Sequence, residues 1–424
     1  MNVLVIGNGG REHAVIQALK KSPKVNKIYA MKGNAGIAAD AELVNVDYMD
    51  TVAVCDWLKR HKDVEFTVVT PDDPLAIGLV DEIEKCGLKA FGPNKNAAII
   101  EASKAFSKNL MKKYGIPTAA YETFDDYNAA KAYVEECALP VVLKADGLAL
   151  GKGVLICKTR EEALQGLAEM MLEEKFGKAG ATVVVEEFLE GPEVSVLSFT
   201  DGKTIVPMIT SCDHKRAKDN DEGLNTGGMG TFSPAPFFGE KSLEEVMKTI
   251  MLPTMSAMNA EGRPFKGVLY FGLMKTKDGY KVIEYNSRFG DPETQVVLPM
   301  LKTDLMEIFE AVADERLADV KIEWRDGACV CLVLASGGYP EKYEKGKEIT
   351  IGQLDQDVVL CHAGTAMKDG KLVTSGGRVL GVCARGKDVE DARKKVYANA
   401  QKIHFDGMYY RSDIGVKYRN VEKE

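Results

Sequence analysis

Two short stretches of the sequence combine residue types that bind phosphate and metal ions. The first is KADGLALGKGV (residues 144–154), which follows the apolar run LPVVL and contains Gly147, Gly151, Gly153, Lys144 and Lys152. Glycines let the backbone approach a ligand closely and the lysines carry compact positive charge, so the stretch favours a phosphate ligand. It lacks the G-x-x-x-x-G-K-[ST] order of a Walker A loop. An ordinary glycine-rich hairpin with solvated lysines is the alternative.

The second stretch is KVIEYNSRFGDPETQ (residues 281–295). Strand alternation predicts that Glu284, Asn286 and Arg288 lie on one face, opposite Ile283 and Tyr285. Carboxylate and amide oxygens suit Mg²⁺ that bridges nucleotide phosphates, and an adjacent arginine can hold a carboxylate or phosphate. The alternative is the exposed face of an amphipathic strand. The segments GDPET and TSCDHKRAKDNDEGLNTGGMGTFSP (residues 210–234) favour a functional site, because no packed core requires them.

A third candidate site is GNGGRE (residues 7–12), at the predicted turn from the first strand into the first helix. The amides of Gly9, Gly10 and Arg11 are expected to point at an anion at the helix N-terminus. A dinucleotide site is disfavoured, because Glu12 occupies the sixth position of G-x-G-x-x-G and Lys32 follows the second strand instead of a ribose-binding acid. The segment therefore predicts a phosphate site.

These segments lie on elements that change in character along the chain. The first 100 residues alternate strand and helix patterns, which predicts a doubly wound parallel sheet. A second domain begins near Ser103, with a helix that ends at Gly115 and an antiparallel hairpin through residues 277–279. After residue 325 the chain is β-rich and ends in a helix. We therefore predict an α/β and α+β multidomain protein with domains at 1–102, 103–325 and 326–424.

Composition narrows the function classes. The 424 residues are 45% hydrophobic with a formal net charge of −8, and charges of both signs are interleaved, so neither a nucleic-acid partner nor a membrane partner is expected. No apolar run reaches the length of a membrane span and no signal peptide is recognisable, which predicts a cytoplasmic protein. The nine cysteines have no metal-binding or disulfide spacing. His214 and His362 lack a recognisable nucleophile partner and are expected to have binding or structural roles.

Several long motifs, in this order, resemble the glycinamide ribonucleotide synthetase family of ATP-grasp enzymes over essentially the whole chain. They are VLVIGNGGREHA, FGPNKNAAIIEASKAF, KADGLALGKGV, DHKRAKDNDEGLNTGGMG, YFGLM, EYNSRFGDPETQ, HAGT and SGGRVL. The resemblance implies an N-terminal domain on the phosphoribosylamine side, an ATP-grasp core with a small lid subdomain at about residues 121–191, and a small β-rich C-terminal domain. It also implies ATP-dependent ligation of glycine to 5-phosphoribosylamine through glycyl phosphate, in de novo purine biosynthesis.

The resemblance assigns roles to individual residues. It implies that ATP is held by a set of phosphate-side lysines, loop glycines, adenine-edge residues and one ribose-binding glutamate, namely Lys104, Lys144, Gly147, Gly151, Gly153, Glu186, Glu187, Phe188, Leu189 and Glu193. It implies Mg²⁺ or Mn²⁺ on Glu284 and Asn286, and catalytic roles for Arg288, Lys144 and Asp213. Substrate-binding residues would be Gly9, Gly10, Arg11, Asn225, Thr226, Gly227, Gly228 and Asp291.

Two segments depart from the family pattern, both on the expected phosphoribosylamine side. TPDDPL stands where GPE is expected, and KGNAG stands where PGNAG is expected. Asp72 and Asp73 either keep the carboxylate function or belong to a differently built site. Another ATP-grasp carboxylate–amine ligase and a catalytically silent nucleotide-binding module are the alternative functions. The expected partners are glycine and 5-phosphoribosylamine, with a transient contact to the enzyme that produces the amine.

Overall fold

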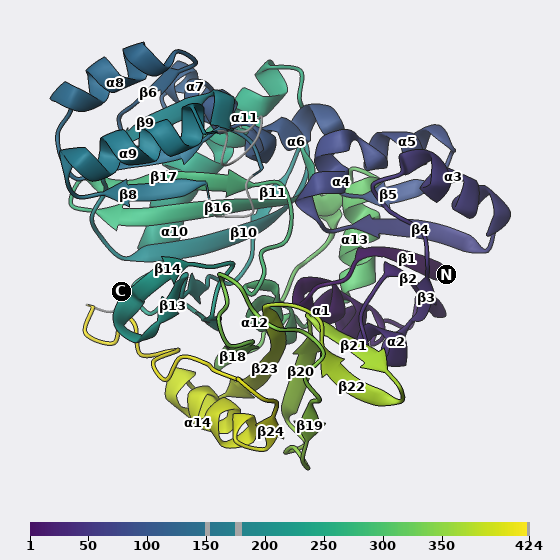
Figure 1. Ribbon diagram of the computed structural model, residues 1–424. Helices are drawn as coiled ribbons and strands as arrows, with labels where there is room; N and C mark the ends of the chain where they lie inside the picture. The colour runs from purple at the N-terminus through teal and green to yellow at the C-terminus, as the bar shows by residue number, and fades with distance from the viewer. Residues whose placement is uncertain (149–152, 174–179, 422–424) are drawn as a thin grey trace.

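The computed structural model describes residues 1–148, 153–173 and 180–421. Figure 1 shows three lobes around a common centre: the N-terminal strands on the right, the lid and core sheets on the left, and the C-terminal strands below. In the part of the chain that is described, no helix has the length and apolarity needed to cross a membrane.

The N-terminal region is a doubly wound parallel sheet, as predicted. Its strands are ordered β3-β2-β1-β4-β5, and every pairing is parallel. Val3 and Val5 of β1 pack into one core and Leu4 and Ile6 into another, which explains the uninterrupted apolar strand. The elements are β1 (Asn2–Gly7), α1 (Gly10–Leu19), β2 (Lys27–Lys32), α2 (Ile37–Asp40), β3 (Glu42–Val44), α3 (Thr51–Arg60), β4 (Val64–Val69), α4 (Asp72–Ile77), α5 (Leu79–Lys85), β5 (Lys89–Phe91) and α6 (Lys95–Ala102).

The middle of the chain begins with a helix and a small antiparallel sheet. The sheet has the order β6-β9-β7-β8, and α8 and α9 cover it at the upper left of Figure 1. The Ser103 hydroxyl accepts a hydrogen bond from the Phe106 amide at the start of α7, and Gly115 ends that helix at a φ of 68°, as predicted. The elements are α7 (Lys104–Tyr114), β6 (Tyr121–Phe124), α8 (Tyr127–Glu136), β7 (Val141–Ala145), β8 (Val154–Cys157), α9 (Arg160–Met171) and β9 (Val183–Glu187).

A second antiparallel sheet, ordered β11-β10-β16-β17, forms the core beneath this lid sheet. The predicted hairpin joins β16 to β17. The elements from this part of the chain are β10 (Glu193–Asp201), β11 (Ile205–Pro207), β12 (Cys212–Asp213), β13 (Arg216–Lys218), η2 (Asp219–Asp221), β14 (Glu222–Asn225), β15 (Gly230–Ser233), α10 (Glu240–Val246), η3 (Met247–Met251), α11 (Leu252–Ala260), β16 (Lys266–Thr276), β17 (Gly279–Asn286), α12 (Thr294–Val297), η4 (Leu298–Met300), α13 (Leu305–Ala313) and η5 (Leu317–Asp319).

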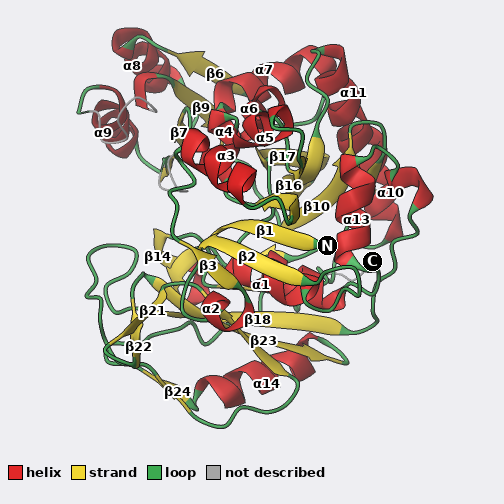
Figure 2. Cartoon of the chain, turned by 90° about the vertical axis from the view of Figure 1, so that its right-hand side faces the viewer, coloured by secondary structure: helices red, strands yellow, loops and turns green. Residues whose placement is uncertain are grey.

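The C-terminal sheet has the order β12-β15-β18-β23-β20. It therefore takes β12 and β15 from the middle of the chain, across the boundary expected near residue 326. Helix α14 packs against β18 and β23 at the bottom of Figure 2. The elements are β18 (Ala328–Ala335), β19 (Thr350–Ile351), β20 (Val358–His362), β21 (Thr365–Lys368), β22 (Lys371–Thr374), β23 (Arg378–Gly386), α14 (Val389–Ala400) and β24 (Ile403–His404).

Candidate active site

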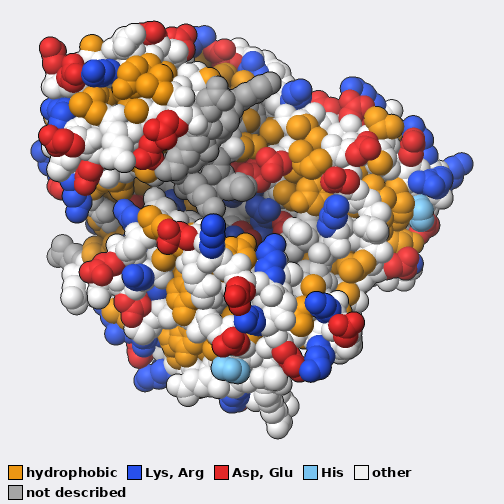
Figure 3. Space-filling view, in the orientation of Figure 1, with side chains coloured by type: hydrophobic (Ala, Val, Ile, Leu, Met, Phe, Trp, Pro, Cys, Tyr) orange, Lys and Arg blue, Asp and Glu red, His pale blue; other side chains and the backbone are white. Residues whose placement is uncertain are grey.

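A central cavity of about 700 Å³ lies where the three lobes meet. Figure 3 looks onto this hollow, with Lys, Arg, Asp and Glu side chains visible on its walls. Most of the predicted site residues line it, namely Arg11, Lys104, Lys144, Gly147, Gly153, Glu186, Glu187, Phe188, Leu189, Glu193, Asp213, Asn225, Thr226, Gly227, Glu284, Asn286, Arg288 and Asp291. The fold thus brings together segments as distant in the sequence as those of Arg11 and Asp291. Gly9, Gly10 and Gly228 do not line the cavity, and Gly151 and Lys152 lie outside the described residues.

Two buried lysines share one carboxylate at the lid side of the cavity. The Glu186 Oε2 atom lies 2.9 Å from Lys144 Nζ and 3.1 Å from Lys108 Nζ, and the Glu186 Oε1 atom is buried without a hydrogen-bond partner. Lys144 also donates to the carbonyl of Ile283 at 3.0 Å. Burial lowers the pKa of Lys108 to about 8. The arrangement concentrates positive charge where an anionic ligand could enter.

Lys104 ties the start of the glycine-rich segment to helix α7. Its ammonium donates to the Gly147 carbonyl at 2.8 Å, and burial lowers its pKa. The Asp146 carboxylate accepts from the Ala105 amide and the Ser103 hydroxyl, so it caps α7. Gly147 has a φ of 102°, a conformation that favours glycine. The phosphate-side lysines and the glycine segment are therefore held in one structural unit.

The predicted adenine and ribose contacts lie at the ends of two strands. Strand β9 ends at Glu187, and Phe188 and Leu189 continue along the cavity wall. Glu193 opens β10, and its amide donates to the Tyr418 hydroxyl at 2.8 Å. Among the described residues, no hydrogen bond engages the Glu193 carboxylate. That carboxylate is thus available to accept from neighbouring hydroxyl groups of a ligand.

The predicted metal pair occupies the last residues of β17. Glu284 and Asn286 both line the cavity, but Arg288 lies beyond the end of the strand. Ile283 and Tyr285, which were predicted on the opposite face, are also among the lining residues, and a register shift of β17 against β16 interrupts the alternation at Ile283. Alternation alone could not reveal this bulge.

The charge at Glu284 is set by a lysine. Lys215 Nζ lies 3.2 Å from Glu284 Oε1, and this ammonium is the main reason that the pKa of Glu284 falls to about 2. The ionised carboxylate and the Asn286 amide oxygen form a hard-oxygen donor set that fits Mg²⁺. Among the residues described, no group of three or more His, Cys, Asp or Glu side chains could hold a metal ion. A metal on this pair would therefore complete its shell with phosphate and water oxygens.

Arg288 is held by a buried glutamate that the sequence motifs did not single out. An Nη atom of Arg288 lies 2.8 Å from Glu101 Oε1, and the other Glu101 oxygen accepts from the amide and hydroxyl of Ser287 at 2.8 Å each. Arg288 also donates to Asn286 Oδ1 at 3.3 Å, while its Nε is buried without a partner. Burial opposes ionisation, yet Glu101 and Asp72 raise the pKa of Arg288. The guanidinium is thus fixed and charged, and Nε is its one nitrogen without a partner among the described residues.

The turn GDPET meets the C-terminal lobe through Arg378. This arginine donates to the carbonyls of Gly227 and Asp291 at 2.8 Å each, and its guanidinium lies 3.4 Å from the Asp291 carboxylate. The Thr226 hydroxyl accepts from the Gly228 amide. Burial raises the pKa of Asp213 well above its usual range. Arg378 joins three chain segments at one side of the cavity.

The predicted anion site at the start of α1 is only partly available. The Gly9 amide already donates to Glu12 Oε2 at 2.6 Å, and the Arg11 amide hydrogen-bonds the Asp291 carboxylate. The prediction that all three amides are free is therefore wrong, because carboxylates of the protein cap this helix. Of the three amides, only that of Gly10 has no acceptor among the described residues.

Sequence reasoning missed residues whose partners are distant in the chain, namely Glu101, Lys108, Lys215, Tyr270, Glu293 and Arg378. The Tyr270 hydroxyl, for example, donates to Glu293 Oε1 at 3.1 Å within the buried wall. Lys108 stands one helical turn after Lys104, which was a signal for it. The other five lie within the motifs quoted above, so their place in those motifs was the available signal. His214 is fully buried, and burial lowers its pKa to about 4, which fits a structural role.

Family models match nearly the whole chain. They are the phosphoribosylglycinamide synthetase N domain over residues 1–101, its ATP-grasp (A) domain over 102–294 and its C domain over 329–417. The phosphoribosylamine–glycine ligase of Caldanaerobacter subterraneus subsp. tengcongensis is 48% identical over 99% of this chain and 100% of that protein. That of Halalkalibacterium halodurans is 47% identical over 98% and 97%.

Solved structures agree with the sequence comparisons. The crystal structure of phosphoribosylamine–glycine ligase from Thermotoga maritima matches with a TM-score of 0.84 and 35% identity, over 98% of this chain and 100% of that one. The biotin carboxylase domain of a Hydrogenobacter thermophilus 2-oxoglutarate carboxylase matches with a TM-score of 0.74 but 16% identity, over 96% and 91%, so it shares the fold alone. The resemblance inferred from the motifs is confirmed.

Proposed function

Because the chain belongs to the phosphoribosylglycinamide synthetase family, we propose that it uses ATP to ligate glycine to 5-phosphoribosylamine. The products are glycinamide ribonucleotide, ADP and phosphate, in a step of de novo purine biosynthesis. The observation that carries the proposal is the central cavity, which joins buried lysines, an ionised Glu284 and a fixed Arg288 in a chain that matches named ligases over its full length. These intact groups disfavour a catalytically silent nucleotide-binding module.

ATP would bind between the lid sheet and the core sheet. Lys144 and Lys104, which line the cavity, would neutralise phosphoryl oxygens, and Glu193 would accept from the ribose hydroxyls. The Glu187–Leu189 segment offers backbone groups to the adenine edge. Lys144 forms an ion pair with Glu186, so phosphate binding would replace or share that ion pair.

A carboxylate is a poor acyl donor, so it must be activated before an amine can attack it. We infer that a glycine carboxylate oxygen attacks the γ-phosphorus of ATP, which forms glycyl phosphate and releases ADP. The amine nitrogen of phosphoribosylamine then attacks the acyl carbon, loses a proton and expels phosphate. Arg288 would orient the glycine carboxylate through its fixed guanidinium.

Glu284 and Asn286 would hold Mg²⁺ or Mn²⁺, because their oxygens suit hard divalent cations. When bound, such an ion neutralises charge on the phosphoryl oxygens. The pairing of Glu284 with Lys215 keeps the carboxylate ionised for this task at neutral pH.

The amine substrate would be held on the side of Arg11, Asp72 and Asp291, which line the cavity opposite the lid. Arg11 and Arg288 carry charge beside Asp72, and despite burial they hold the pKa of that carboxyl below its usual range. Asp72 therefore fits the carboxylate role expected of the TPDDPL segment. Because N-glycosylamines decompose in water, we propose that the enzyme that makes the amine delivers it by transient contact, in the cytoplasm.

The proposal is tested by coupled measurement of ADP release with glycine and freshly prepared phosphoribosylamine. We expect release to require both substrates. Release that fails with glycine but proceeds with another amino or carboxylic acid would favour a different ATP-grasp ligase. Tight ATP binding without any release would favour a silent nucleotide-binding module.

The ribose contact makes a separate prediction at Glu193. Replacing Glu193 with Ala should raise the KM for ATP about tenfold, because two charge-assisted hydrogen bonds are lost. The same change should raise the KM for 2′-deoxy-ATP less, since that nucleotide already lacks one of the hydroxyls. Steady-state kinetics with both nucleotides measures the difference. Equal effects on the two nucleotides would place the ribose elsewhere.

A further inference from the structure

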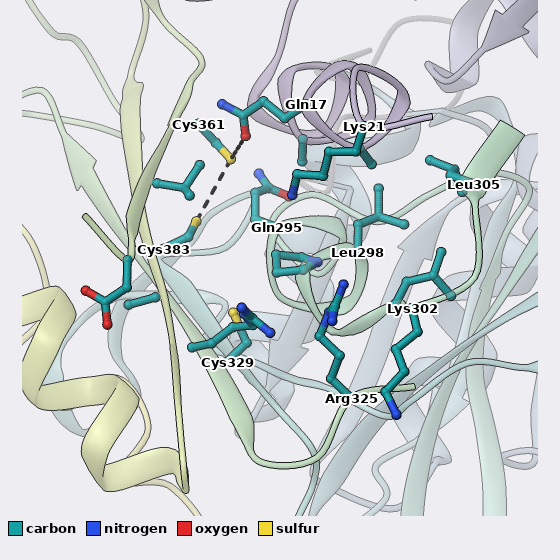
Figure 4. A pocket seen from close by; sticks show the side chains of 18 of the residues that line it. Gln17, Lys21, Gln295, Leu298, Lys302, Leu305, Arg325, Cys329, Cys361 and Cys383 are labelled. Atoms are coloured by element: carbon teal, nitrogen blue, oxygen red, sulfur yellow. Dashed lines mark hydrogen bonds between the residues drawn. The ribbon is translucent and has the colours of Figure 1, made fainter. Parts of the chain in front are cut away.

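A second cavity of about 750 Å³ lies apart from the proposed active site. It is enclosed by helix α1, the segment after α12, and strands β18, β20 and β23 (Figure 4). None of the residues assigned above to ATP, glycine, phosphoribosylamine or metal is among the described residues that line it. The second cavity is therefore a distinct place where a ligand could bind.

The second cavity is rich in positive charge. Six lysine or arginine residues line it but only three aspartates do. Two of these aspartates are already engaged: Asp357 lies 2.6 Å from Lys395 Nζ, and Asp304 accepts from the Ser22 hydroxyl and the Met306 amide. The lining thus holds an excess of cations that its own carboxylates do not neutralise.

Among the described residues, five of the six cations have no carboxylate partner, the exception being Lys395; the proposal concerns three of these five, Lys21, Arg325 and Arg385. All three line the second cavity. Burial, followed by the charges of Arg325 and Arg385, lowers the pKa of Lys21. In Figure 4 the side chains of Lys21 and Arg325 extend into the same space. Their mutual repulsion would be relieved by an anion placed between them.

A buried amide adds a second, independent requirement. Gln295 is only 3% exposed and lines the second cavity, and its Oε1 atom has no hydrogen-bond partner. Its Nε2 atom donates to Asp291 Oδ1 at 2.7 Å, and Asp291 lines the central cavity. An unpaired buried acceptor is unfavourable, and a ligand hydroxyl or amine would satisfy it. Gln295 therefore connects the two cavities through one side chain.

We propose that the second cavity binds a phosphate monoester that carries hydroxyl groups, such as a sugar phosphate or a nucleoside monophosphate. Its phosphate, with a charge of about −1.5 to −2 at neutral pH, would lie between Lys21, Arg325 and Arg385. A ligand hydroxyl would donate to Gln295 Oε1. Because Gln295 also donates to Asp291, a ligand bound to Gln295 would alter the position of Asp291 on the substrate side of the central cavity.

The test observes Lys21 itself, because a phosphorylated ligand could also enter the central cavity. The full chain is labelled with ¹³C at lysine Cε, and the Lys21 signal is assigned with Lys21→Arg. We expect ribose 5-phosphate to shift the Lys21 signal and raise its pKa, with an affinity about tenfold higher than that of inorganic phosphate because of the added hydroxyl contact.

Variants then locate the binding groups. Arg325→Ala should weaken ribose 5-phosphate binding, read at Lys21, by about tenfold through loss of a charge-assisted contact. Gln295→Met should remove the advantage of ribose 5-phosphate over inorganic phosphate. Lys345→Ala is the matched control, since Lys345 is exposed and lies away from the cavity lining, and it should leave both affinities unchanged.

An unshifted Lys21 signal at millimolar ribose 5-phosphate would overturn the proposal, as would an Arg325→Ala variant that binds like the wild type. Equal affinities for ribose 5-phosphate and inorganic phosphate would overturn the role of Gln295. If ribose 5-phosphate shifts the Lys21 signal and AMP does not, the site is assigned to sugar phosphates rather than to nucleoside monophosphates. None of these measurements requires ligase activity, so their failure leaves the proposed function standing.

Discussion

Glu284→Gln should lower kcat by about 10²–10³-fold while the fold remains intact. The change keeps the side-chain volume but removes the charge that would neutralise and hold a divalent cation. It also leaves Lys215 without its carboxylate partner at 3.2 Å, so the charge of the ammonium is no longer balanced at this wall of the cavity. The effect is expected to be large because one substitution weakens the binding of the metal ion and also removes the negative charge that pairs with Lys215.

Turnover is measured over a Mg²⁺ titration, and circular dichroism checks the fold. Glu341→Gln is the matched control, because Glu341 is exposed and lies outside the cavity lining. We expect the control to behave like the wild type at every Mg²⁺ concentration. Near-normal turnover of Glu284→Gln at limiting Mg²⁺ would contradict the assignment of the metal pair.

Arg288→Lys should also reduce kcat by about 10²-fold or more, although it preserves the charge. The guanidinium contacts Glu101, Asn286 and the Phe289 carbonyl at once, and its remaining Nε points into a buried space without a partner. A lysine ammonium cannot reproduce the planar set of donors of the guanidinium, so the glycine carboxylate would lose its orientation. The KM for glycine should rise, whereas ATP affinity should change little.

Glycine-dependent kinetics and separate equilibrium binding of ATP distinguish these effects. Arg60→Lys is the matched control, because it makes the same change at an exposed position at the end of α3, and it should leave both measurements unchanged. A Glu101→Gln variant should show a weaker version of the same glycine defect, because Glu101 acts by holding Arg288. A defect confined to ATP binding would place Arg288 in the nucleotide site.

Most of the fold could be predicted because its local signals agree with the tertiary structure. The apolar strand before GNGGRE, the helix that ends at Gly115 and the hairpin after Thr276 all form where the pattern indicates. Period-two alternation located Glu284 and Asn286 on one wall of the cavity. A bulge interrupts the alternation at Ile283, whereas Arg288, beyond the end of the strand, still lines the same cavity and donates to Asn286 Oδ1.

The rest of the site depends on contacts between distant segments. Lys108 contacts Glu186, which lies 78 positions later in the sequence. Arg378 lies beside Gly227 and Asp291 because β18 pairs with β15 in the C-terminal sheet. The Gly9 amide seemed free in the sequence, yet Glu12 folds back onto it. Local pattern carries no information about such pairings, so the ion pairs that tune the site became visible only in the structure.

The central claim is that ATP activates the glycine carboxylate as an acyl phosphate within the central cavity. Its most direct test uses glycine labelled with heavy oxygen in the carboxylate, together with ATP and freshly prepared phosphoribosylamine. If γ-phosphoryl transfer occurs, the inorganic phosphate released will carry one labelled oxygen and the nucleotide product will be ADP. Unlabelled phosphate beside ADP, or label in AMP with release of pyrophosphate, would contradict the account and the roles proposed for Arg288 and the Glu284–Asn286 pair.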